Sequence, residues 1–123
     1  MNHSILIVDD EPDIREILTM CLQLASGWTV SSARSGAECL QVAPRLRPDL
    51  IVLDSMMPGM DGMETLQSLR QQPGCEKTIV VLLSAKTHAE EDGALRRLGV
   101  SGTLLKPFDP STISDELKAF LAH

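Results

Sequence analysis

Aromatic side chains are scarce in this sequence, which has one tryptophan, two phenylalanines and no tyrosine among 123 residues. Basic residues are also in deficit, because 11 lysines and arginines face 17 aspartates and glutamates, which leaves a formal net charge of −6. That balance argues against direct binding to nucleic acid or to anionic membrane surfaces. No apolar run approaches the roughly 20 residues of a membrane span, so membrane insertion is not expected either.

Cysteine is limited to Cys21, Cys39 and Cys75, an odd number without the paired spacing of a zinc site. We interpret all three as reduced thiols. The amino terminus has no basic segment of the kind that opens a signal peptide, so a cytoplasmic protein is expected. The length suits a single domain over residues 1–123, with about 65% of the unfolded surface buried on folding.

Four short apolar runs each end in a polar residue that could handle metal or phosphate. They are Ile5–Val8 before Asp9 and Asp10, Leu50–Leu53 before Asp54, Ile79–Leu83 before Ser84, and Thr103–Leu105 before Lys106. Unbroken apolar runs of this length are typical of parallel strands buried on both faces. In an open parallel sheet the functional crevice lies at the carboxyl ends of the strands. The pattern therefore predicts three acids, a hydroxyl and a lysine along one sheet edge.

Helical patterns alternate with these runs, and residues 28–32 fit an edge strand. The expected helices run from Pro12 to Gly27, from a Ser35–Glu38 capping box to a stop before Pro44 or Pro48, from Asp61 and Glu64 to Pro73, over about 88–98, and onward from Asp109–Pro110. The first should turn a stripe of Ile14, Ile17, Leu18, Cys21, Leu22 and Ala25 to the core. This order predicts an α/β fold, a doubly wound five-stranded parallel sheet of (βα)5 type with the flavodoxin-like strand order 2-1-3-4-5.

The predicted edge gathers charges that need a partner. Two carboxylates about 4 Å apart repel each other by roughly 4 kcal/mol at an effective dielectric constant of 20. A hard divalent cation offsets such repulsion, and Mg²⁺ favours one or two carboxylates together with water and phosphate oxygens. Lys106 adds a positive charge that suits phosphate, and Ser84 adds a hydroxyl donor. Together these groups could hold a phosphoryl group on a carboxylate nucleophile.

Four motifs in this order resemble the receiver domain of two-component response regulators, over nearly the whole chain. They are Val8-Asp9-Asp10-Glu11, the segment from Asp54 to Gly62, Leu83-Ser84-Ala85, and Leu105-Lys106-Pro107-Phe108. The resemblance implies that Asp54 is the phosphoacceptor. It also implies a Mg²⁺ or Mn²⁺ ion bound by Asp9, Asp10, Asp54 and the backbone carbonyl of Met56.

The same resemblance assigns roles at the other two strand ends. Ser84 would move to hydrogen-bond the phosphoryl group, Lys106 would pair with it, and the Lys106–Pro107 peptide bond would be cis. Members of the family often have Tyr or Phe three residues before the lysine, as an aromatic switch. This sequence has Thr103 there, so that switch is absent or replaced.

The implied partners are a sensor histidine kinase or a histidine phosphotransfer protein as donor, and a downstream protein as target. The target would meet a face formed by the helix near 88–98, the last strand and the last helix. The implied chemistry is confined to the domain's own phosphorylation and dephosphorylation, so it is not an enzyme in the usual sense.

Three other functions compete with this one. A haloacid-dehalogenase-like phosphatase also uses an aspartyl nucleophile, but it needs a second aspartate two residues later, where this chain has Met56. A flavodoxin-like redox carrier needs a Ser/Thr/Gly-rich phosphate loop after the first strand, where Asp9, Asp10 and Glu11 stand. An adaptor that signals without phosphate would not need the intact Asp54 and Lys106.

Overall fold

The computed structural model describes residues 3–55, 57, 62–85, 97 and 99–122. In chain order the elements are β1 Ser4–Val8, α1 Pro12–Ser26, β2 Thr29–Ala33, α2 Gly36–Leu46, β3 Leu50–Asp54, α3 Gly62–Leu69, β4 Ile79–Ala85, β5 Gly102–Lys106 and α5 Ile113–Leu121. The helix expected near 88–98 falls almost entirely outside the described residues, as does Asp61, the expected cap of α3. None of the described helices is long and apolar enough to cross a membrane.

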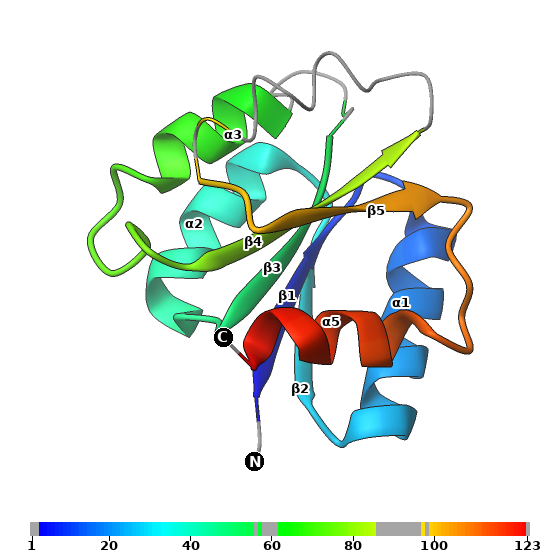
Figure 1. The fold of residues 1–123 in the computed structure, drawn as a ribbon. Helices are drawn as coiled ribbons and strands as arrows, with labels where there is room; N and C mark the ends of the chain where they lie inside the picture. The colour runs from blue at the N-terminus through cyan, green and yellow to red at the C-terminus, as the bar shows by residue number, and fades with distance from the viewer. Residues whose placement is uncertain (1–2, 56, 58–61, 86–96, 98, 123) are drawn as a thin grey trace.

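The five strands form one parallel sheet in the order β2-β1-β3-β4-β5, which confirms the predicted topology (Figure 1). Helices α1 and α5 cover one face, and α2 and α3 cover the other (Figure 1). Along β1, Leu6 and Val8 pack in the apolar cluster on the α2–α3 side, whereas Ile5 and Ile7 pack in the cluster on the α1–α5 side. Both faces of the strand are therefore buried, which is why it is apolar at every position.

Helix α1 begins and ends where the sequence predicts. Pro12 occupies its first position, and Gly27 closes it in the left-handed conformation with φ of 67°. Leu18 and Leu22 are fully buried. The prediction for Ile17 was wrong, because this side chain is 42% exposed. Consecutive residues lie about 100° apart around a helix, so with Leu18 facing the sheet Ile17 turns to the border with solvent.

The end of helix α2 confirms one of the two predicted stops, whereas the starts of β2 and α5 differ from the prediction. Helix α2 continues past Pro44 and ends at Leu46, ahead of Pro48, with Arg47 in the left-handed conformation at φ of 46°. Its amino terminus agrees with the prediction, since the Ser35 hydroxyl accepts a hydrogen bond from the Glu38 N–H. Strand β2 begins one residue late, at Thr29, and Trp28 lies buried before it.

Helix α5 begins at Ile113, three residues later than Pro110. The intervening residues form a separate turn, in which the Asp109 carbonyl accepts hydrogen bonds from the Thr112 and Ile113 N–H groups. The Asp109 carboxylate accepts two more from Ser111, one from its N–H and one from its hydroxyl. An aspartate that binds its own backbone in this way favours a turn over the first turn of a helix.

The cysteines should differ sharply in reactivity. Cys39 and Cys75 are fully buried, whereas Cys21 is partly exposed. Burial, reinforced by Cys75, raises the pKa of the Cys39 thiol from 9.0 to about 12. We expect iodoacetamide to alkylate Cys21 first in the native protein and to reach Cys39 only on unfolding, as followed by intact mass. Because the pKa of Cys39 is higher in the folded state, the thiol ionises first in the unfolded state. The free energy of unfolding should therefore decrease as pH rises above about 9. Early alkylation of Cys39 in native protein would contradict this.

Candidate functional site

Three carboxylates meet at the carboxyl edge of the sheet. Asp9 and Asp10 follow β1 directly, and Asp54 is the last residue of β3. Strands β1 and β3 are neighbours with Val8 opposite Leu53, so the two strand ends lie together. Each carboxylate offers an oxygen, and these oxygens lie within 4.8 Å of one another. The side chains of Asp9 and Asp54 are buried, with residue exposures of 0% and 3%.

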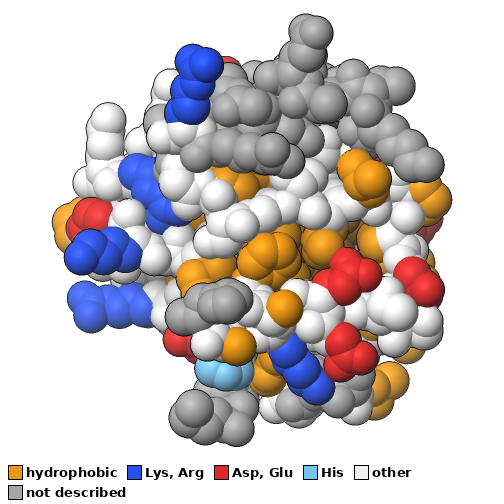
Figure 2. Space-filling view, viewed as in Figure 1, with side chains coloured by type: hydrophobic (Ala, Val, Ile, Leu, Met, Phe, Trp, Pro, Cys, Tyr) orange, Lys and Arg blue, Asp and Glu red, His pale blue; other side chains and the backbone are white. Residues whose placement is uncertain are grey.

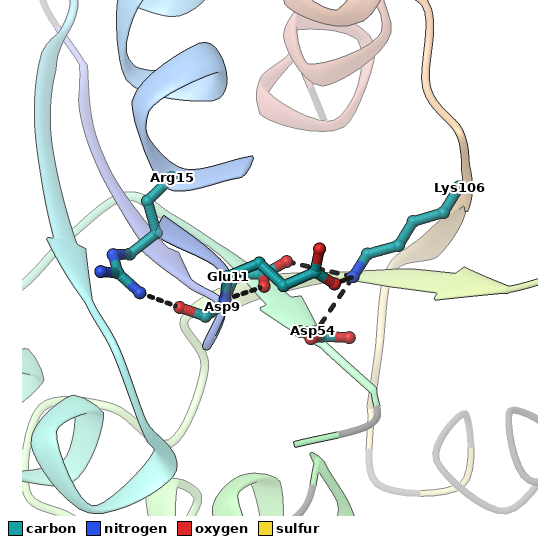
Figure 3. Close-up of polar contacts among 5 residues, drawn as sticks. All are labelled: Asp9, Glu11, Arg15, Asp54 and Lys106. Carbon is teal, nitrogen blue, oxygen red and sulfur yellow. Dashed lines mark hydrogen bonds and ion pairs between the residues drawn. The ribbon is translucent and has the colours of Figure 1, made fainter. Parts of the chain in front are cut away.

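Lys106 reaches this cluster from the end of β5 (Figure 3). Its Nζ lies 3.2 Å from Asp9 Oδ2, 3.4 Å from Asp54 Oδ2 and 3.5 Å from Glu11 Oε1. Burial by itself would lower the pKa of Lys106, but the carboxylates of Asp54, Asp9 and Glu11 outweigh burial and raise that pKa above its usual value. The lysine is therefore charged at neutral pH. The Lys106–Pro107 bond is cis, as the resemblance implied.

Two residues that the sequence analysis did not single out complete this end of β1. The Glu11 N–H donates a hydrogen bond to Asp9 Oδ1 at 2.9 Å. Arg15 Nη1 donates one to the Asp9 backbone carbonyl at 2.7 Å, from the side of the site opposite Lys106 (Figure 3). Both contacts fix the turn that orients Asp9. Glu11 belonged to a motif already noted, but no pattern in the sequence distinguishes Arg15 from a solvated helix residue.

Ser84 and Thr103 occupy different levels of the sheet. Ser84 lies near the end of β4, 1% exposed, and follows Leu83, the register partner of Asp54. Thr103 lies deeper, opposite Leu82, and its buried Oγ1 has no hydrogen-bond partner among the residues that the structure describes. Ser84 is thus close in register to the acid cluster, whereas Thr103 is further from the edge. Met56, whose carbonyl was expected to bind metal, lies outside the described residues.

The charges at this edge do not balance. The four carboxylates of Asp9, Asp10, Glu11 and Asp54 lie near two described cations, Lys106 and the Arg15 guanidinium on the Asp9 carbonyl, which leaves about two negative charges when all are ionised. The cluster of Asp9, Asp10 and Asp54 offers only oxygen ligands, which hard cations such as Mg²⁺ and Mn²⁺ prefer. Its donor chemistry and its charge therefore fit a divalent cation.

The sequence matches the response regulator receiver domain family over residues 5–118. It is 39% identical over 121 residues to the alkaline phosphatase synthesis transcriptional regulatory protein PhoP of Bacillus subtilis, covering 98% of this chain and 49% of that protein. It is 37% identical over 119 residues to the probable transcriptional regulatory protein TcrX of Mycobacterium tuberculosis, covering 96% and 49%. The chain thus spans about half the length of these relatives.

Solved structures agree with this match. The fold is similar to that of the chemotaxis response regulator CheY4 of Vibrio cholerae, with a TM-score of 0.89 and 34% identity over 97% of this chain and 98% of that one. It is also similar to a putative response regulator from Chloroflexus aurantiacus, with a TM-score of 0.90 and 32% identity over the full length of both.

Gly62, at the start of α3, packs closely against the residue that follows Asp54. A Cβ atom at this position would lie 2.9 Å from both the Cα and the carbonyl oxygen of Ser55, the residue after Asp54. We expect Gly62→Ala to lower the free energy of unfolding by about 1–3 kcal/mol, the usual cost of overpacking, as measured by chemical denaturation.

The matched control is Gln67→Ala, at an exposed position of the same helix. It should change the free energy of unfolding by less than about 0.5 kcal/mol. A Gly62→Ala variant as stable as the wild type would show that the close approach of α3 to Ser55 is not a packing constraint.

Proposed function

This chain belongs to the response regulator receiver domain family, and we propose that it accepts a phosphoryl group on Asp54 within a two-component system. The observation that carries the proposal is the cluster of Asp9, Asp10 and Asp54, in which the buried Asp9 and Asp54 lie 3.2 Å and 3.4 Å from Lys106 Nζ. Core packing has no use for three carboxylates at one sheet edge, because buried charges destabilise the fold unless they are paired. Residues 1–123 would form a single receiver domain.

In the proposed reaction a carboxylate oxygen of Asp54 attacks the phosphorus of the donor. The new bond forms as the bond between phosphorus and the donor's leaving atom breaks, and the leaving group departs with that electron pair. Asp9 and Asp10, with Asp54 and the Met56 carbonyl, would hold Mg²⁺ or Mn²⁺, which supplies charge neutralisation for the phosphoryl oxygens when bound.

The other two side chains would act on the phosphoryl group after transfer. The charged Lys106 pairs with one phosphoryl oxygen, and the Ser84 hydroxyl donates a hydrogen bond to another. Thr103 would stand in for the aromatic switch residue on β5. The domain's chemistry would be confined to its own Asp54, since position 56 lacks the second aspartate of a phosphatase.

The donor would be a sensor histidine kinase or a histidine phosphotransfer protein in the cytoplasm. The relatives named above are transcriptional regulators about twice as long, so any output through a further domain is a property of those proteins. For this domain we propose that a protein target meets the face formed by β5, α5 and the segment before β5. On that face, apolar side chains gather over β5 and α5 beside acidic ones (Figure 2). Leu105 of β5 is 47% exposed there.

Phosphorylation of Asp54 is directly testable with a small-molecule donor. Acetyl phosphate with Mg²⁺ should add one phosphoryl group to the intact mass of the protein, and chelation of the metal should prevent it. Asp54→Asn should abolish the adduct, because an amide is not a nucleophile in this reaction. Asp13→Asn, an exposed aspartate of α1, is the matched control and should be modified like the wild type. An adduct that persists in Asp54→Asn would refute the assignment.

The output face can be located with beryllofluoride, an analogue of the phosphoryl group, and Mg²⁺. Lys106 is the last residue of β5, so its capture by the analogue should alter amide hydrogen exchange over residues 102–108. Helix α2, Gly36–Leu46, serves as the internal reference, because the described ion pairs of Lys106 are with Asp9, Glu11 and Asp54 and none is with this helix. Changes confined to α1 and α2 would place the output surface elsewhere.

A further inference from the structure

The side chain of Glu11 contacts Lys106 and does not cap the helix that it precedes. It is the residue that precedes α1, with extended backbone angles φ −88° and ψ 115°, yet its side chain does not cap the helix. The carboxylate instead crosses to Lys106, 95 residues later in the chain, with Oε1 3.5 Å from Nζ. The Glu11 side chain is 59% exposed. Because Lys106 also pairs with Asp9 and Asp54, this contact links Glu11 to the acid cluster.

This contact adds a third carboxylate to the two aspartates that pair with Lys106. An ammonium group has three N–H donors and no acceptor. Within the described residues Lys106 has three carboxylate partners, at 3.2 Å, 3.4 Å and 3.5 Å (Figure 3). The Glu11 contact is also a hydrogen bond, so one of the three donors is engaged with Glu11 before any phosphoryl group arrives. A phosphoryl oxygen that pairs with Lys106 must therefore compete with these carboxylates for the ammonium group.

Glu11 is the carboxylate that a phosphoryl group can most readily displace from Lys106. Asp9 is fully buried and its other oxygen is held by the Glu11 N–H, while Asp54 is itself the proposed acceptor. Glu11 has the longest of the three contacts with Lys106 and the most exposed side chain. It also lies outside the cluster of Asp9, Asp10 and Asp54, so a bound cation has no need of it.

The contact between Glu11 and Lys106 also borders a groove on the surface. Glu11 and Lys106 both line a surface groove of about 390 Å³, together with Ile14, Ile17 and Phe108. The Glu11 carboxylate is thus accessible to solvent beside Lys106. A negative charge next to the lysine disfavours the approach of an anionic donor, and it does so most for small anions that bring no compensating contacts.

We propose that Glu11 is a positioning residue that competes with the phosphoryl group for Lys106 and so restrains phosphorylation by small anionic donors. The proposal rests on the proposed function of Asp54. Removing the Glu11 carboxylate frees one N–H of Lys106 for the incoming group. The gain is limited to about two- to five-fold, because the pair that is lost is solvent-exposed.

The test compares Glu11→Gln and Glu11→Ala with the wild type and with Glu16→Gln, an exposed glutamate of α1 that makes the same change in net charge. NMR titration gives two dissociation constants for each protein, one for Mg²⁺ and one for beryllofluoride at saturating Mg²⁺. Both Glu11 variants should bind beryllofluoride about two- to five-fold more tightly than Glu16→Gln does, with Mg²⁺ affinities equal to that of Glu16→Gln within about two-fold. Their rates with acetyl phosphate should rise by the same factor.

Three outcomes would overturn the proposal. Weaker beryllofluoride binding in the Glu11 variants would make Glu11 a tether that orients Lys106. Equal changes in Glu11→Gln and Glu16→Gln would reduce the effect to net charge, and no change in either would leave Glu11 without influence on Lys106. If the wild type itself fails to bind beryllofluoride or to form the Asp54 adduct, the proposed function fails as well, which separates the two conclusions.

Discussion

The unequal pairing of several carboxylates with one lysine is the constraint on which the rest of this site depends. Asp9 and Asp54 are buried at the end of a mostly apolar sheet, and Lys106 is the cation that pairs with both of them. Burial of an ion without full compensation is unfavourable, so the fold retains an unmet demand for positive charge at this edge. That demand gives the edge its affinity for a divalent cation. Strands β1, β3 and β5 each bring one of these charged side chains to the edge of the sheet.

The parallel sheet is what makes the convergence predictable. Because each central strand is covered on both faces, it is apolar along its length, and its first polar residue marks the edge of the sheet. Asp54 ends β3 and Lys106 ends β5, as the pattern of the sequence indicates. The strand order then brings distant segments together, since β1 and β4 both flank β3. Local pattern and topology were therefore sufficient to predict the fold and to gather the acids with Lys106.

The remaining features depend on side-chain reach and on local competition, which a sequence pattern does not encode. Glu11 meets Lys106 across 95 residues because both side chains are long enough to meet over the ends of β3 and β4, which lie between β1 and β5. Arg15 donates a hydrogen bond to the backbone carbonyl of Asp9. Every residue has such a carbonyl, so the sequence does not indicate which one an arginine will bind. Ile17 fits the apolar period of α1 but lies at the limit of its buried stripe. The late start of α5 reflects the hydrogen bonds by which Asp109 holds its own turn.

Phosphorylation would enlarge the charge imbalance, and this explains how chemistry at Asp54 could act at a distance. A phosphoryl group carries about −1.5 to −2 charges, more than the single charge of the carboxylate that it replaces. The pull on Lys106 then increases, and Lys106 is the last residue of β5, directly before the segment that leads to α5. Thr103, on the same strand, has a buried hydroxyl for which the described part of the chain offers no hydrogen-bond partner, and such a group is costly in a packed interior. Strand β5 therefore carries both Lys106, which responds to the added charge, and the Thr103 hydroxyl, which lacks a hydrogen-bond partner among the described residues. A rearrangement of β5 that strengthens the pairing of Lys106 and gives the hydroxyl a partner would be favoured.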